Sequence, residues 1–311
     1  NSWVYKEQAD QGFSDYAVAC EVLAWFNNKI GDYPYSKLAN VQSKTRYGGM
    51  ENASCIFYFE NSVNGKNEVE DLIAHEIAHQ WFGNSATEAD WSHLWLSEGF
   101  ATYLTDLYIL EKFGEEQFKT RMQSERTKAV DFHQKYPHPI IDTTYQNINH
   151  LLNPNSYQKG AWVLHMLRNE LGNDLFWKII KSYYHKYALK NANSTNFINH
   201  VTKESNKDLK PMLQQWLKNA GHPNLDIAYS IDYENKEVIV TITQKQDMAF
   251  FFPLEINIAL ENATLSEKLL VHQKEQSFRI KAPLLSKENS FSSLQIDPAC
   301  KLFAQWTILT P

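Results

Sequence analysis

The sequence of 311 residues has few cysteines, no excess of basic charge and no long apolar run. Its three cysteines, at positions 20, 55 and 300, are too few and too scattered for a disulfide framework or a four-thiolate zinc site. Acidic residues (36) outnumber basic ones (30), which argues against a general nucleic-acid binder because neutralising phosphates requires a dense basic surface. No apolar run approaches the roughly 18–20 residues that span a bilayer, so we expect no membrane span.

The overall composition is that of a folded globular protein. Hydrophobic residues make up 43% of the chain and charged residues 21%. At about 150 residues per domain, the length predicts two domains. The chain starts at Asn1 without an initiator Met or a signal peptide, so we expect a piece or a processed form of a longer protein. Its compartment stays open, and a monomer is the default expectation.

The hydrophobic pattern changes near residue 221. Before that point, apolar residues recur at spacings of three and four, which predicts helices. We place them at residues 14–29, 68–83, 92–113, 157–171, 174–189, 195–204 and 209–220, with extended segments at 37–43 and 54–60. After that point, apolar and polar residues alternate, as at Val238, Val240 and Ile242, which predicts short strands. The fold class is therefore α+β, with a mainly helical domain at 1–221 and a small antiparallel β-sandwich at 222–311.

The segment His-Glu-Ile-Ala-His at residues 75–79 carries the clearest chemical signal. On a helix, residues four apart share a face, so the imidazoles of His75 and His79 can bind one metal ion. Glu76 projects from the adjacent part of that face and is predicted to be a catalytic base rather than a ligand. Bound zinc activates a water molecule, and Glu76 can take the proton of that water and pass it to the leaving amine.

A third ligand is available on the next predicted helix, where Glu98 lies within Trp-Leu-Ser-Glu-Gly-Phe-Ala at residues 95–101. Two antiparallel helices can bring Glu98 to the histidine pair and leave one coordination position open, as in catalytic zinc sites. The alternative is a solvated helix carboxylate. The apolar neighbours Leu96 and Phe100 argue against it, because an unpaired carboxylate beside them would be costly. The sequence therefore predicts one Zn²⁺ per chain and a zinc hydrolase.

Upstream of the histidine motif, Gly-Gly-Met-Glu-Asn occupies residues 48–52. Paired glycines let another backbone approach closely. We expect the β-rich run that follows, at 54–60, to offer an edge to which a peptide adds as a strand.

Four segments in this order resemble the signatures of the aminopeptidase N family of zinc metallopeptidases. They are residues 48–52, residues 75–84 with the sequence His-Glu-Ile-Ala-His-Gln-Trp-Phe-Gly-Asn, residues 95–101, and Tyr-Gln-Lys-Gly-Ala at 157–161. The similarity extends over essentially the whole chain. It implies a thermolysin-like, mainly helical zinc catalytic domain followed by the β-sandwich. It also implies hydrolysis of the N-terminal bond of peptides with a free N-terminus.

The resemblance also implies roles for individual residues. Glu51 matches the glutamate that binds the free α-amine of the substrate, and a carboxylate at a fixed distance from zinc would select a first residue. Gly48 and Gly49 match the part of the motif that contacts the substrate backbone, and Met50 would lie near the first side-chain pocket. Tyr157 matches the tyrosine that donates a hydrogen bond to the oxyanion of the tetrahedral intermediate.

The chain departs from the family pattern in small and large features. Gly49 stands where many relatives have Ala, and Ser97 where Asn is usual. Relatives carry a β-rich domain before the catalytic one, which adds a Gln or Glu to the amine pocket, and longer members carry a helical C-terminal domain. Neither domain is present in this sequence, so we expect zinc binding to be kept and substrates to bind more loosely than in an intact enzyme.

Other functions stay open at this point. A thermolysin-like endopeptidase shares the metal set but needs no amine anchor. A catalytically inactive peptide-binding or scaffold protein would be expected to have lost Glu76 or a ligand, and none is lost. Epoxide hydrolysis, as in leukotriene-hydrolase-like members, has no positive sign in the sequence.

Overall fold

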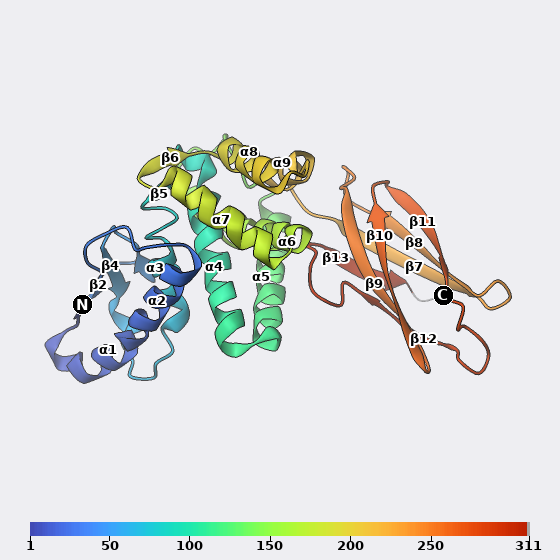
Figure 1. Cartoon of the computed structure of the whole chain (residues 1–311), viewed down its shortest axis with the longest axis horizontal. Helices are drawn as coiled ribbons and strands as arrows, with labels where there is room; N and C mark the ends of the chain where they lie inside the picture. The colour runs from blue at the N-terminus through green and yellow to red at the C-terminus, as the bar shows by residue number, and fades with distance from the viewer. Residues whose placement is uncertain (310–311) are drawn as a thin grey trace.

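The computed structural model describes residues 1–309 and shows a helical region followed by a region of β-sheets (Figure 1). This is the α+β architecture that the sequence predicts. The helices are α1 (Ala9–Asp15), α2 (Ala19–Lys29), α3 (Glu70–Ala78), α4 (Trp95–Phe113), α5 (Glu115–Lys135), α6 (Gly160–Leu171), α7 (Asn173–Tyr187), α8 (Ser194–Ser205) and α9 (Lys210–Lys218). Among residues 1–309, none of these helices combines the length and apolarity that crossing a membrane requires.

A four-stranded sheet at the N-terminal end has the order β1-β2-β4-β3. Its strands are β1 (Ser2–Trp3), β2 (Ala39–Ser43), β3 (Gly49–Met50) and β4 (Cys55–Phe59). The expectation that the run at 54–60 offers a free edge is wrong, because β4 pairs on one side with β2 and on the other with β3. The edge strand is β3, so Gly49 and Met50 themselves form this border of the sheet.

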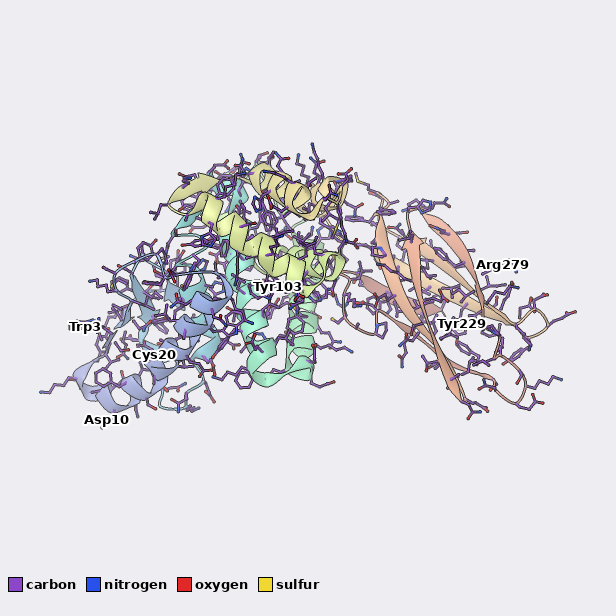
Figure 2. All side chains as sticks on the ribbon, viewed as in Figure 1. Trp3, Asp10, Cys20, Tyr103, Tyr229 and Arg279 are labelled. Carbon is purple, nitrogen blue, oxygen red and sulfur yellow. The ribbon has the colours of Figure 1, made fainter. Side chains whose placement is uncertain are left out.

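Helix α4 is the centre of the helical region, and every residue from Trp95 to Ile109 is buried. It packs against α3, α5 and α6. A side-chain carbon added at Gly99 would lie 3.0 Å from the backbone of Gly160. Helix α4 and the start of α6 therefore contact each other directly through their backbones, which glycine at both positions permits. Tyr103, labelled in Figure 2, lies inside this region and shares a hydrogen bond of 3.0 Å with His165.

Two parts of the helical region differ from the sequence-based expectation. Helix α5 was not predicted at all. The helix expected at 14–29 is interrupted by a 3₁₀ turn, Tyr16–Val18, and regular helix resumes at Ala19. The Asp15 carboxylate just before this turn accepts hydrogen bonds from the backbone N–H groups of Asn64, Gly65 and Asn67, each at 2.8 Å. This tertiary contact fixes the chain where local periodicity predicted a continuous helix.

The β region contains two sheets, of order β10-β9-β12 and β11-β8-β7-β13. Their strands are β7 (Asn224–Asp232), β8 (Glu237–Gln244), β9 (Phe252–Leu260), β10 (Ala263–Val271), β11 (Glu275–Lys281), β12 (Phe291–Ile296) and β13 (Gln305–Leu309), and a small separate pair joins β5 (Ala86–Glu88) to β6 (Lys190–Ala192). The alternating residues Val238, Val240 and Ile242 are buried. One detail departs from the expected antiparallel pattern, because β13 pairs parallel to β7.

The sheets and helices meet through polar and aromatic contacts. The Lys119 ammonium donates to the carbonyl of Pro298 at 2.7 Å, and the rings of Trp162 and Phe303 lie 5.8 Å apart. Helix α9 ends at Lys218 and β7 begins at Asn224. We retain the division into domains 1–221 and 222–311 as a proposal.

Candidate metal centre and active site

Helices α3 and α4 bring together the two histidines and the glutamate that the sequence singled out. The Nε2 atoms of His75 and His79 lie 3.0 Å apart. The Oε2 atom of Glu98 lies 3.2 Å from the first and 3.1 Å from the second. Ligand atoms around a tetrahedral zinc ion with bonds of ~2.0–2.1 Å lie about 3.3 Å from one another. The spacing and the nitrogen and oxygen donors therefore fit a zinc ion. Within residues 1–309, this is the one group of three or more His, Cys, Asp or Glu side chains able to hold a metal.

A shell of hydrogen bonds orients His79. Its Nδ1 atom lies 3.1 Å from the carbonyl of Phe82 and 3.0 Å from the hydroxyl of Ser97. A donor at Nδ1 favours the tautomer in which the Nε2 lone pair is free to bind a metal ion. Ser97, where relatives usually have Asn, thus keeps a polar contact with the ligand, a role that the sequence did not reveal.

The electrostatics of the three ligands reflect their burial together. Burial lowers the pKa of His79, but the Glu98 carboxylate more than offsets this and raises the pKa to about 10. Burial alone would raise the pKa of Glu98, yet the charge of His79 and hydrogen bonds from both imidazoles hold it below its ordinary value. A deeply buried carboxylate is thus stabilised in its ionised form, which is the form that binds a cation.

Glu76 lies beside the ligands without bonding to them. Its side chain is buried, and the burial, together with the charges of Glu51 and Glu98, raises its pKa to about 8 against the opposing effect of His79. Its carboxylate fills the space next to Gly49, where an added side-chain carbon would be 2.1 Å from Oε1. Glu76 therefore faces strand β3, the segment predicted to hold the substrate.

Tyr157 joins the site from a π-helical turn, Asn155–Lys159. Its hydroxyl donates a hydrogen bond of 2.8 Å to Oε1 of Glu98, and its ring stacks on His75 with centroids 5.9 Å apart. Burial, followed by the Glu98 charge, raises its pKa far above the ordinary value, so the phenol stays protonated and can donate. The sequence predicts Tyr157 at the start of a helix but does not predict this π-helical turn, in which backbone hydrogen bonds join residues five apart instead of four.

The Gly-Gly-Met-Glu-Asn segment is held against α3 by two side chains to which the sequence had assigned no role. The amides of Gln80 and Asn84 donate to the carbonyl of Glu51 at 2.8 and 2.6 Å. The Glu51 charge contributes to the raised pKa values of both Glu76 and Tyr157, so its carboxylate belongs to the same electrostatic neighbourhood. Gly48 and Met50 lie on the exposed border of the sheet. The signal that could have revealed Gln80 and Asn84 is their place directly after the histidine motif.

The site opens into a polar cavity of about 300 Å³. His75, Tyr157, Thr102, Arg121 and Lys128 are among the residues that line it. Of the three candidate ligands, His75 is the one that lines this cavity, so the cavity borders the metal centre at His75.

Two histidines and a carboxylate that converge beside an unbonded glutamate define a metal centre of the His-Glu-x-x-His class. The sequence matches the description "Peptidase family M1 domain" over residues 15–216. The chain therefore belongs to peptidase family M1, the aminopeptidase N family of zinc metallopeptidases. This confirms the resemblance drawn from the four sequence segments.

Two curated relatives support the family assignment, and one solved structure shares the fold. Aminopeptidase M1-B of Oryza sativa subsp. japonica is 34% identical over 230 residues, which are 70% of this chain and 26% of that protein. The alanine/arginine aminopeptidase of Saccharomyces cerevisiae is 28% identical over 319 residues, covering 93% of this chain and 36% of that protein. The structure of Legionella pneumophila aminopeptidase A in complex with aspartic acid superposes with a TM-score of 0.81 at 17% identity, over 98% of this chain and 36% of that one. The chain thus spans about a quarter to a third of the length of these relatives.

Proposed function

We propose that this chain is the catalytic part of a zinc aminopeptidase, which removes N-terminal residues from peptides. The observation that carries the proposal is the convergence of His75, His79 and Glu98, with spacing suited to zinc, beside Glu76 and Tyr157. One Zn²⁺ held by these three ligands would act as a Lewis acid on the scissile carbonyl and on the attacking water.

The residues around the ligands supply the remaining steps. Glu76 accepts a proton from the attacking water and delivers it to the leaving amine, and the same burial that raises its pKa makes its carboxylate a stronger base. Tyr157 donates its hydroxyl proton in a hydrogen bond to the oxygen that becomes negative as the carbonyl is attacked, a contact worth ~3 kcal/mol. Glu51 pairs with the α-ammonium of the substrate and so places the first peptide bond at the site.

The role of Glu51 separates an aminopeptidase from an endopeptidase. We expect cleavage of a peptide with a free N-terminus and little cleavage of the same peptide after N-acetylation. Glu51→Gln should lower kcat/KM for the free peptide by roughly 10- to 100-fold, because a hydrogen bond to a charged group contributes about 1.5–3 kcal/mol. Initial rates on the two peptides provide the measurement. Equal cleavage of both would remove the amine anchor and favour a thermolysin-like endopeptidase.

The contact between Gly49 and Glu76 gives a second prediction. In Gly49→Ala, the new side-chain carbon would overlap the Glu76 carboxylate, which must then shift. Because many relatives have Ala at this position, we expect the shift to be small and kcat to fall by no more than roughly a few-fold. Zinc content should not change, because neither residue is a ligand. Gly48→Ala is the matched control, since its added carbon would meet only Leu72 Cδ1 at 3.5 Å, an ordinary contact. Equal kcat values in the two variants would show that Glu76 does not need the space left by glycine at position 49.

A further inference from the structure

A separate cavity, of about 510 Å³, lies where the end of α5 and the segment after α9 meet the β region. It shares no lining residue with the cavity beside His75. Two imidazoles, those of His133 and His222, take part in its wall. Five side-chain amides, Gln134, Asn219, Asn224, Gln246 and Gln305, also line it.

Three ring nitrogens of these two histidines are buried without a hydrogen-bond partner among residues 1–309. His222 is 5% exposed, and both of its ring nitrogens are buried without a partner in the described part of the chain. The same holds for Nδ1 of His133, whose ring lies 5.6 Å from that of His222. A buried polar atom left unbonded costs about 1–3 kcal/mol, and most buried polar atoms in proteins are bonded. These nitrogens therefore mark a place where a polar ligand would be stabilised.

The buried side chain of Lys159 contacts Asn219, one of the residues that line this cavity. Lys159 is 2% exposed, and its Nζ donates to the carbonyl of Asn219 at 3.3 Å. No carboxylate pairs with it among residues 1–309. Burial lowers its pKa to about 7. Burial, then the charges of His133 and Lys159, lowers the pKa of His222 to about 3. The charge of Lys159 thus opposes the protonation of both imidazoles, and an anion beside them would favour it.

We propose that this cavity is a binding site for a small oxyanion of the carboxylate or phosphate type, held by His133 and His222 with Lys159 as the counter-charge. Protonated imidazoles donate from both nitrogens, which suits oxygen acceptors. A metal ion fits less well, because a buried ammonium would repel it. The remaining charged groups of the lining are Lys218, which favours an anion, and the exposed Asp247, which opposes one.

The test follows the imidazole resonances of the protein by NMR while inorganic phosphate is added, with acetate in a parallel arm. We expect saturable shifts of the His133 and His222 signals. Affinity should weaken as pH rises through about 7, because Lys159 then loses the proton that favours an anion. A response to phosphate alone assigns a phosphate-type ligand, and a response to acetate assigns a carboxylate.

Two variants make the test specific. His222→Phe keeps an aromatic ring against Phe303, and Lys159→Met keeps an apolar stem, and each should weaken anion binding by about tenfold or more. His272→Gln, at an exposed histidine of the β region, should bind like the unchanged protein. If a buried variant fails to fold, the half-buried His133→Gln serves in its place. Linear shifts without saturation, or unchanged binding in the folded variants, would show that His133 and His222 pack against each other and hold no ligand.

Discussion

Replacing Glu76 by Gln is expected to lower kcat by about 10²- to 10⁴-fold, the usual contribution of a general base. The amide has nearly the same shape as the carboxylate but cannot accept the proton of the attacking water. Because Glu76 touches Gly49 and is not one of the metal ligands, the bound zinc should remain. Steady-state kinetics on a peptide with a free N-terminus, together with metal analysis of the same sample, measure both quantities.

Glu68→Gln is the matched control for this result. Glu68 precedes α3 and is exposed, so its replacement changes the net charge equally without touching the site. We expect its kcat to match that of the unchanged protein. Full activity in Glu76→Gln would show that another group moves the proton. Loss of zinc from that variant would instead place Glu76 among the ligands.

The second large effect is expected for Glu98→Gln. This change removes the charge that joins both imidazoles, so the protein should lose most of its zinc and essentially all of its peptidase activity. Loss of a ligand that binds only the folded state should also lower the midpoint of thermal unfolding. Removing zinc from the unchanged protein with a chelator should lower that midpoint in the same direction. Zinc per chain, activity and melting temperature are the three measurements.

A buried glutamate elsewhere tests whether such a loss is specific. Glu237, in β8, is 9% exposed and pairs with Arg279 and Lys281. Glu237→Gln is compared with Glu98→Gln, and we expect Glu237→Gln to keep one zinc ion per chain. If Glu98→Gln retained zinc and activity, the proposed ligand set would be wrong.

The group of His75, His79 and Glu98, which could hold a metal ion, was found from the sequence because the motif depends on local spacing. His75 and His79 share a helix face by periodicity, and the apolar neighbours of Glu98 demanded a partner for its charge. The shell that orients them could not be predicted in this way. Ser97 meets His79, and Gln80 meets the carbonyl of Glu51, only after two helices and a strand have packed.

Helix α5 shows why part of the fold escaped prediction. Its buried residues are Phe118, Met122, Glu125, Ala129 and Val130, so its inner face includes a glutamate and few large apolar groups. In such a sequence, apolar residues recur only weakly at the spacings of three and four that predict a helix. The helix is fixed instead by long-range contacts, such as the hydrogen bond from Arg121 to the buried Asp106 of α4. Contacts of this kind cannot be inferred from one chain segment alone.

The close approach of Gly99 and Gly160 has a consequence for the chemistry. Glu98 directly precedes one glycine, and Tyr157 lies three positions before the other. A methyl group at either glycine would act as a spacer between the two helices and carry the phenol away from the carboxylate that it now touches. The distance between the proposed oxyanion donor and the candidate metal ligand therefore depends on glycine at both positions.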